Sequence, residues 1–469
     1  MLEFSVSVSD LEFGSRLVPS FYYFSQILKN KNRKKGIEYI NLERISSEIS
    51  DGEHSHIPRN SKGGVRYLYG RNIKEGVINF DPVSDDPYID ESDYKAFPRC
   101  HIRDRDILIT IYGTIGKSAV YHRDYVGTAG IPRHISNIRL SKDAPVTAEF
   151  ITAYLRSKIG KLHLDSVTTG NIQQLLSLKN IRKFEIPVPE REFIDRITLL
   201  DQTALQYETT ALALIDKAQR LFRSSLRCDL SSVRKEFSFS VPSASLTEAN
   251  MWTSNCFNSL YVNTAALLKQ HHQVCRLGDI AHIKNGDEAG SDLYKQYVDR
   301  DAGDIPFIRT SDIVNYEPDL YPDYYIPPLV YEALGQDTRE KDILFTKDGK
   351  VGAVGMLTAE DKVILSSGLV RLRVNRAGRA KKITPEYLFL ALSIREIGYY
   401  AAIRRTVVAS TIPHLREERL REIEIPLIDD EAIREITESV RTAFLNKAER
   451  KRIYKEIERE MEKYFSISG

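Results

Sequence analysis

The sequence contains little cysteine. Its 469 residues include only four cysteines, Cys100, Cys228, Cys256 and Cys275. No two of them form a Cys-x-x-Cys pair, so neither a thiolate zinc site nor a disulfide framework is indicated. His54 and His56 are the nearest approach to a metal pair, and no further ligand stands at zinc-site spacing. We therefore expect reduced thiols, a cytoplasmic protein and no metal site.

Long apolar runs and an excess of one charge are also missing. No stretch of about 18 apolar residues occurs, so no transmembrane helix is expected. The N-terminal stretch MLEFSVSVSDLEFGS lacks a basic segment followed by an apolar one, so no signal peptide is expected. The formal net charge is +2, which excludes a globally basic protein but not local basic surfaces.

The stretch ILITIYGTIGKSAV, residues 107–120, resembles a phosphate-binding loop. Such a loop has the pattern GxxxxGK[ST] between a strand and a helix. Here the first glycine is replaced by Ile111, and the residues after Ser118 have no helical period. The sequence instead predicts a glycine-containing hairpin between two strands.

Other catalytic motifs are incomplete. Pro322-Asp323 followed by Asp348-Gly349-Lys350 resembles the carboxylate pattern with which nucleases hold Mg²⁺. DDPY at 85–88 resembles part of an adenine-methyltransferase motif, but no Gly-x-Gly loop for S-adenosylmethionine accompanies it, and no GxSxG is present. A metal-dependent nuclease using Asp323, Asp348 and Lys350 stays open as an alternative.

The most informative feature of the sequence is an internal repeat. Asp106-Ile107-Leu108 recurs as Asp342-Ile343-Leu344, and the glycines at 113 and 116 recur at 349 and 352. TAEFITAYL (147–155) recurs as TPEYLFLAL (384–392), and Ile186-Pro187 recurs as Ile425-Pro426. The matches keep their order along the chain, which chance matches do not. The repeat predicts two similar mixed α/β units.

Each repeat ends in a long helix. The helices are expected to have about 36 residues, which makes them about 54 Å long. Each carries apolar residues at alternating spacings of three and four, typical of a coiled-coil seam. The seam residues are Ile197, Leu200, Ala204, Ala211, Leu214 and Leu221 in the first helix, and Ile433, Ile436, Val440, Ile457 and Met461 in the second. Lys447 and Arg450 interrupt the second seam, which indicates a partner-binding face or a local splay.

These elements predict an α+β fold. Two mixed α/β domains in a pseudo-twofold repeat are joined by two long antiparallel coiled-coil helices. The expected boundaries are 1–188 for the first domain, 189–230 for the first helix and the linker start, 231–250 for the linker, 251–427 for the second domain and 428–469 for the second helix. Thr147 is expected to cap the helix after residue 147, and Gly160 to end it.

Basic residues gather locally in both halves, with tyrosines and histidines among them. Such side chains suit contacts with DNA phosphates and base edges. The DNA-binding candidates are Lys62, Arg66, Lys117, Arg133 and His134 in the first half, and Arg309, Lys347, Lys350 and Arg371 in the second. Arg133 and His134, in the turn GIPRHIS, are the expected base-reading pair.

The order of motifs resembles a known family. A unit with DILITIYGTIGK, then TTGNIQQLLSLKNIRKFEIPVP and a long helix, is followed by a second copy containing ASTIPHLREERLREIEIPLI. This order is similar to that of the specificity subunits of type I restriction–modification enzymes, over nearly the whole chain.

The resemblance implies a non-catalytic subunit. Each unit would be a target recognition domain that reads one half of a split site in double-stranded DNA. The helices would dock two adenine-methyltransferase (modification) subunits, and restriction/translocase subunits would complete the complex. S-adenosylmethionine, ATP and Mg would be bound by those partners, and no cofactor by this chain. A scaffold whose coiled coil only bridges proteins is a further alternative.

Overall fold

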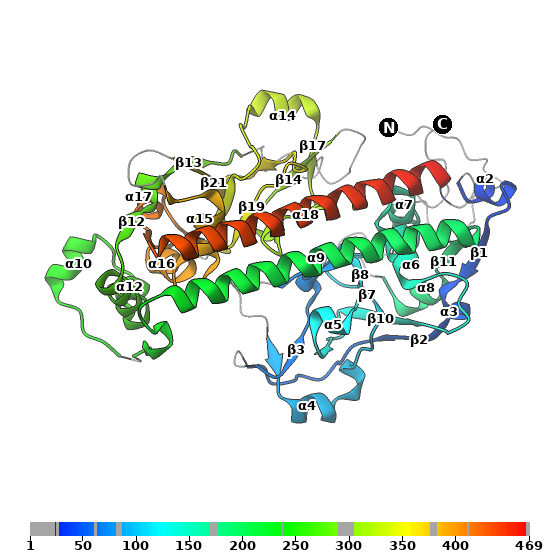
Figure 1. The fold of residues 1–469 in the computed structure, drawn as a ribbon. Coiled ribbons are helices and arrows are strands. Elements are labelled where there is room, and N and C mark those ends of the chain that lie inside the picture. Colours follow the sequence, from blue (N-terminus) through cyan, green and yellow to red (C-terminus); the bar gives the residue numbers. More distant parts are fainter. Residues whose placement is uncertain are drawn as a thin grey trace. The chain divides into compact units, whose positions relative to one another are not determined.

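The computed structural model describes residues 24, 28–60, 63–80, 87–168, 176–236, 238–288, 304–375, 382–409 and 412–465. The chain divides into two compact units. The first unit contains residues 1–80, 85–206 and 452–469, and the second contains 81–84 and 207–451. The long helices α9 (Arg191–Ser225) and α18 (Asp430–Phe465) therefore each give one end to the first unit and the other end to the second (Figure 1).

The first unit is built on small sheets with short helices. The sheet orders are β2-β10-β7-β8, β6-β3-β9, β1-β11 and β4-β5. The strands are β1 (Glu38–Asn41), β2 (Ser46–Asp51), β3 (Val65–Tyr67), β4 (Ile73–Lys74), β5 (Val77–Ile78), β6 (Tyr88–Ile89), β7 (Ile107–Thr110), β8 (Ser118–Val120), β9 (Ala129–Gly130), β10 (Ile135–Leu140) and β11 (Glu185–Val188). The helices are α2 (Lys29–Lys34), α3 (Leu42–Ile45), α4 (Glu91–Ala96), α5 (Arg123–Val126), α6 (Ala148–Arg156), α7 (Lys158–Val167) and α8 (Leu178–Lys183).

The second unit has the same set of sheets, with orders β13-β21-β18-β19, β17-β14-β20, β12-β24 and β15-β16, and the added hairpin β22-β23. Its strands are β12 (Val274–Arg276), β13 (Ala281–Asn285), β14 (Ile305–Ile308), β15 (Ile313–Val314), β16 (Glu317–Pro318), β17 (Tyr325–Ile326), β18 (Ile343–Thr346), β19 (Val354–Met356), β20 (Ile364–Leu365), β21 (Leu369–Val374), β22 (Val407–Ala409), β23 (Ile412–His414) and β24 (Glu424–Pro426). Its helices are α10 (Ser243–Ala249), α11 (Ser254–Phe257), α12 (Ser259–His271), α13 (Leu277–Ile280), α14 (Pro328–Leu334), α15 (Pro385–Ser393), α16 (Gly398–Arg404) and α17 (Glu417–Arg421). The expected mixture of α and β structure is confirmed.

The glycine-containing stretch after Ile107 is a hairpin, as predicted. β7 pairs antiparallel with β8, so no helix follows Gly116 and no phosphate loop forms. Gly113 and Gly116 have φ values of 77° and 83°, a region that glycine adopts without strain. The hydroxyl of Thr110 accepts the amide hydrogen of Lys117 at 3.1 Å, which closes the turn.

The helix after Thr147 ends earlier than expected. The Thr147 hydroxyl accepts the Phe150 amide hydrogen at 3.1 Å, which confirms the N-cap. α6 ends at Arg156, and Ser157 caps a second helix, α7, which continues past Gly160. Gly160 is therefore not a C-cap. It lies where a Cβ atom would stand 1.8 Å from the Tyr154 carbonyl oxygen, so its role is to allow this close approach.

Within the first unit, the start of α9 runs antiparallel to the end of α18. Phe193 stacks on Tyr464 with ring centroids 4.0 Å apart. Arg196 pairs with Glu460 at 2.5 Å. The buried seam of α9 includes Ile197 and Ala204, as predicted, but Asp201 rather than Leu200 lies buried between them. Asp201 is neutralised there by Arg156 at 2.8 Å.

The same shift of a buried position by one residue recurs in the part of α9 that belongs to the second unit. Ala211 is buried as expected, and Ala218 is buried as well, but Ile215 and Phe222 take the fully buried places predicted for Leu214 and Leu221. Those two leucines pack at the margin of the cluster, which also contains Ile433, Ile436 and Val440 of α18. Helix α9 thus turns a face about one residue away from the predicted seam toward the core.

The interruption of the second seam is a buried ionic network in the second unit. Its members are Glu208, Glu317, Asp361, Lys447, Arg450 and Lys451. Lys447 Nζ lies 3.1 Å from Glu208 and 3.0 Å from Glu317. Lys451 Nζ lies 2.7 Å from both Glu317 and Asp361. Because Lys447 and Arg450 are buried, the partner-binding face expected there is wrong.

Candidate nucleic-acid interface

An exposed polar surface surrounds the β7–β8 turn of the first unit. We call it the first-unit patch and define it as His54, Arg99, Tyr112, Arg133 and His134. Arg133 and His134 are both exposed, in the turn before β10. The Tyr112 ring, 49% exposed, meets the His134 ring edge-on with centroids 5.5 Å apart. The predicted base-reading pair therefore lies beside an aromatic ring that can also contact DNA.

Backbone hydrogen bonds fix the turn that carries this pair. The Arg133 amide donates to the Glu53 carbonyl at 2.9 Å, and the Ile111 amide donates to the His134 carbonyl at 3.0 Å. The side chains of Arg133 and His134 consequently project from a backbone held on both sides. Such preorganisation reduces the entropy lost when a side chain binds a base edge.

The charges of the first-unit patch are partly balanced by Asp51. His54 Nε2 lies 2.8 Å from the Asp51 carboxylate, and Arg99 also donates to it. Burial alone would raise the pKa of Asp51, but these two hydrogen bonds hold it below its ordinary value. Partial burial lowers the pKa of His134, and the nearby Arg133 and His54 lower it further. A neutral His134 at pH 7 can both donate and accept a hydrogen bond.

The matching surface of the second unit has different side chains. The Lys347 amide donates to the Gly368 carbonyl at 2.9 Å, so Ser367 and Gly368 stand where Arg133 and His134 stand in the first unit. Lys347 Nζ lies 3.2 Å from Asp348, and His414 also bonds to Asp348. The Ser367 hydroxyl donates to Glu288 at 3.0 Å. This surface is less basic than the first-unit patch.

Three further predicted DNA-binding cations, like Lys347, are paired with carboxylates of the fold. Lys117 is 8% exposed and its Nζ lies 3.9 Å from Glu75. Arg309 bonds to Asp312 at 3.0 Å and to Asp323 at 2.9 Å. These pairs hold each cation against a neighbouring carboxylate, and the DNA contacts predicted for Lys117 and Arg309 stay predictions that require these pairs to open.

Arg371 is the third such cation. It is 9% exposed, donates to the Asp337 carbonyl, and lies 3.6 Å from the Asp337 carboxylate and 3.9 Å from Asp342. Lys350 is half-buried, and Lys62 lies outside the described residues. Of the predicted cations, Arg133 has the most exposed position among those that the structure describes.

The carboxylates of the nuclease alternative do not form a metal site. Asp323 is bound to Arg309, and Asp348 to His414 and Lys347. Within the described ranges, no three His, Cys, Asp or Glu side chains gather as metal ligands.

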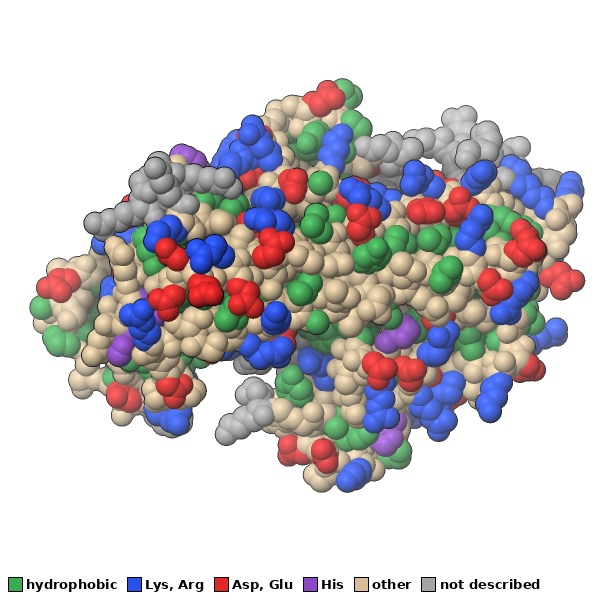
Figure 2. All heavy atoms as spheres, viewed as in Figure 1, with side chains coloured by type: hydrophobic (Ala, Val, Ile, Leu, Met, Phe, Trp, Pro, Cys, Tyr) green, Lys and Arg blue, Asp and Glu red, His purple; other side chains and the backbone are tan. Residues whose placement is uncertain are grey.

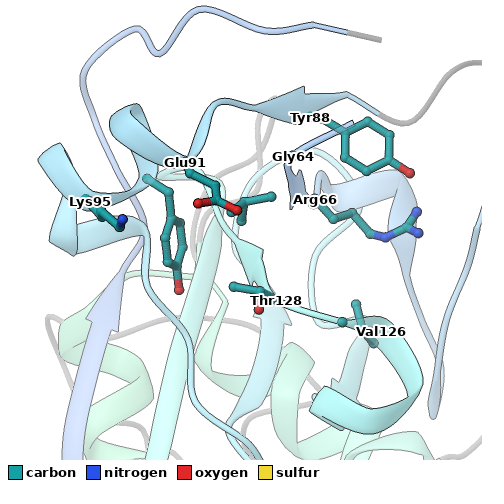
Figure 3. Close-up of a pocket in the computed structure, with 10 residues that line it drawn as sticks. Gly64, Arg66, Tyr88, Glu91, Lys95, Val126 and Thr128 are labelled. Carbon is teal, nitrogen blue, oxygen red and sulfur yellow. The ribbon is translucent and has the colours of Figure 1, made fainter. Parts of the chain in front are cut away.

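Arg66 contributes to a pocket of about 490 Å³ in the first unit (Figure 3). The pocket lies between α4, which gives Glu91, Tyr94 and Lys95, and the sheet β6-β3-β9, which gives Tyr88 and Arg66. No site prediction from the sequence includes Tyr88, Tyr94 or Lys95. The signal for the α4 wall was Glu91 and Lys95 four residues apart, a spacing that places both on one helical face.

On the face shown in Figure 2, basic and acidic side chains alternate over much of the surface. This mixture agrees with the formal net charge of +2 and places any DNA contact on local patches. No helix in the described part of the chain has the length and hydropathy needed to cross a bilayer.

Comparison with known families gives one match. Residues 270–459 match the family model described as "Type I restriction modification DNA specificity domain". This match lies in the second half of the sequence and agrees with the resemblance that the sequence motifs show. No curated protein matches the chain.

Two solved structures align with most of this chain. The S subunit of the type I restriction–modification system from M. genitalium has a TM-score of 0.36 at 14% identity, over 92% of this chain and 97% of that chain. The HsdS subunit from Thermoanaerobacter tengcongensis has a TM-score of 0.28 at 15% identity, over 92% of this chain and 96% of that chain. At such TM-scores these likenesses carry no argument, and the resemblance rests on the family match.

Proposed function

We propose that this chain is the sequence-specific DNA-binding specificity subunit of a type I restriction–modification complex, and that it reads a double-stranded target in two separated parts. The observation that carries the proposal is the repeated turn with unlike side chains. Both units hold the same backbone, but one displays Tyr112, Arg133 and His134, and the other displays Lys347 and Asp348. Two such surfaces would recognise two different half-sites.

Recognition in the first half-site would use the first-unit patch. Arginine pairs with the O6 and N7 atoms of guanine in the major groove, and a neutral histidine can donate to or accept from a base edge. Arg133 and His134 are proposed to make these contacts. Arg99 and His54 would provide attraction for the phosphates beside them. Lys347 and Lys350 stay the proposed contacts of the second half-site.

The long helices are proposed to act as an antiparallel coiled coil that sets the gap between half-sites. A helix of 35 residues, as α9 has, is about 52 Å long, and one turn of DNA is about 34–36 Å. The same helices are proposed to dock two adenine-methyltransferase subunits, with restriction/translocase subunits completing the complex. This chain would be non-catalytic, and S-adenosylmethionine, ATP and Mg would be held by the partners.

Lengthening both helices tests this proposal. Seven residues that continue the heptad, inserted in α9 and at the facing place in α18, add about 10 Å, which is about three base pairs at 3.4 Å each. The unread gap in the methylated target, mapped by methylome sequencing with the partner subunits present, is expected to lengthen by about three base pairs. As a control, seven residues inserted near Ser240 should leave the gap unchanged. An unchanged gap in the lengthened helices would refute the spacer role.

A further inference from the structure

The pocket beside α4 is open and has both aromatic and charged walls. Its volume of about 490 Å³ lies within the range of about 300–1,000 Å³ typical of small-molecule sites. Figure 3 shows Lys95 and Glu91 on one side of it and Tyr88 and Arg66 on the other, with Val126 and Thr128 below them. This is the size and composition of a site for one aromatic, partly charged molecule.

The walls are held in place by stacking. The Arg66 guanidinium lies 4.6 Å from the centroid of the Phe80 ring and 5.4 Å from that of Tyr88. Tyr94 stacks on His101 with centroids 4.0 Å apart, and His101 Nε2 lies 2.6 Å from the Tyr94 carbonyl oxygen. These contacts hold both tyrosines in place, which reduces the ordering entropy of binding.

The chemistry of these walls matches a nucleotide. Tyrosine rings stack on any nucleobase, and arginine adds a cation–π contribution. A glutamate carboxylate such as that of Glu91 accepts hydrogen bonds from the amino group of a base. Lys95, exposed on α4, provides a positive charge for a phosphate.

In the second unit, a lysine side chain covers the position that corresponds to this pocket. The strand registers align Val65 with Ile305 and Tyr67 with Phe307, so Thr128 corresponds to Lys362 and Tyr94 to Tyr331. Lys362 Nζ lies 5.2 Å from the centroid of the Tyr331 ring. Arg66 corresponds to Pro306. The short Thr128 side chain leaves the tyrosine wall of the first unit open, whereas a lysine covers it in the second.

We propose that the pocket of the first unit binds a single nucleotide, with its base against the tyrosine wall and its phosphate beside Lys95. The nucleotide could come from bound DNA, as one base unstacked from the helix, or from solution. We assign it to the DNA, and this assignment rests on the proposed function. Tyr88 and Tyr94 would then add recognition of one base to that of the first-unit patch, and the short Thr128 side chain would leave room for that base.

The first test uses the full-length chain without DNA. Each of the four deoxynucleoside monophosphates is titrated by calorimetry, with inorganic phosphate as the comparison. Binding of at least one nucleotide is expected to weaken tenfold or more in Thr128→Lys, because the lysine covers Tyr94 as Lys362 covers Tyr331. Thr128→Val, which keeps the side-chain size and loses the 3.3 Å bond from Arg123, should bind as the original chain does.

This pair of variants separates a nucleotide pocket from a simple anion site. A surface that only attracts anions would bind more tightly in Thr128→Lys, which adds a positive charge, and would bind phosphate as well as nucleotide. That result overturns the proposal. Lys95→Ala, an exposed position with little effect on folding, should weaken nucleotide binding about tenfold and serves as a second variant if Thr128→Lys does not fold.

The second test uses the assembled complex on its DNA target, with 2-aminopurine at each position in turn. One position in one half-site is expected to show a several-fold rise in fluorescence, which Thr128→Lys abolishes while the footprint stays. A footprint without any rise overturns the DNA source, and nucleotide binding in the first test would then assign the pocket to a free nucleotide. Nucleotide binding with no footprint would contradict the proposed function and support the pocket. If no nucleotide binds in the first test and no fluorescence rise occurs in the second, the proposed pocket is overturned.

Discussion

The turn after β7 in the first unit and the turn after β18 in the second share a backbone but not a surface. The Thr110 and Thr346 hydroxyls accept amide hydrogens at 3.1 Å and 2.8 Å. The Gly116 and Gly352 amides each donate to the carbonyl of that threonine at 2.9 Å. These hydrogen bonds fix the backbone of both turns, while the side chains around the turns differ. This is what two recognition surfaces for unlike half-sites require.

The buried charges of the units differ more strongly. The first unit buries smaller charged groups, such as Arg156 with Asp201 of α9, where Arg156 also lies 4.3 Å from the Tyr454 ring. The second unit buries the six-residue ionic network around Glu317. A buried network tolerates loss of a partner poorly. The difference predicts that the second unit is the more sensitive to single charge removals.

The largest effect is expected from Glu317→Gln. It leaves the three cations of the network with too little negative charge, and removing one partner from a buried ionic network destabilises by about 3–5 kcal/mol. Urea unfolding of the full chain, combined with hydrogen exchange to locate the loss in the second unit, would measure it. As a control, Glu438→Gln breaks an exposed pair with Arg441 and should change the free energy of unfolding by about 1 kcal/mol or less. Equal effects would contradict the network's importance.

The same network predicts how stability depends on pH. Burial raises the pKa of Glu317, but Lys447, Lys451 and Arg450 together lower it below its ordinary 4.5. Its contribution is thus present above pH 4.5 and is lost as the pH falls through the lowered value. Burial lowers the pKa of Lys451, but Asp361 and Glu317 raise it above 10.5, so its contribution is lost only as the pH rises through that raised value.

Stability of the second unit should therefore be level between about pH 5 and pH 10 as far as this network is concerned. Denaturant midpoints measured across this range would show it. The loss on the acid side should be shallower when Glu317 and Lys451 are replaced together by Gln and Met. An unchanged acid slope in that double variant would assign the acid loss to other carboxylates.

A smaller and equal effect is expected at the shared turn. Thr110→Val and Thr346→Val each leave one buried amide hydrogen without its side-chain acceptor, which destabilises by about 1–3 kcal/mol. Thermal unfolding should show similar losses for both variants, compared with Thr203→Val on the exposed side of α9. A loss of stability in only one of the two variants would show that the two turn backbones are not equivalent.

The smallest effect on folding, but a selective one on binding, is expected from Arg133→Ala. Loss of an arginine contact to a base weakens binding by about 1–3 kcal/mol, and the exposed site should leave unfolding unchanged. Ser367→Ala is the matched change in the second unit and should not alter recognition by the first. Filter binding with single-base variants of the target would show whether only one half-site loses discrimination.

Much of this architecture follows from sequence pattern, and the errors share one cause. The repeat predicts the hairpins, the Thr147 cap and the long helices, because turns, caps and periodic apolar residues depend on local sequence. The apolar pattern of α9 selected Leu200, whereas the structure buries the neighbouring Asp201, and it buries Glu208 as well. Arg156 and Lys447, far away in sequence, neutralise them, and no local pattern reveals such partners.

The predictions of DNA-binding residues rest on charge, and the local sequence does not show which charges are paired within the fold. Lys117, Arg309 and Arg371 were selected for their charge, yet Glu75, Asp312 and Asp337 engage them within the fold. Arg133 is exposed on the turn between β9 and β10, where the motif GIPRHIS indicated a turn. The pocket beside α4 depends on Thr128 being shorter than Lys362, a comparison that becomes visible only once the strand registers align the units.

Sequencing of methylated DNA, from cells that contain this chain with its partner subunits, tests the central claim most directly. The account predicts a target in two parts with an unread gap, and predicts that replacing Arg133 and His134 by alanine relaxes one part and leaves the other intact. An uninterrupted target, or equal relaxation of both parts in that variant, would contradict separate recognition by the two units.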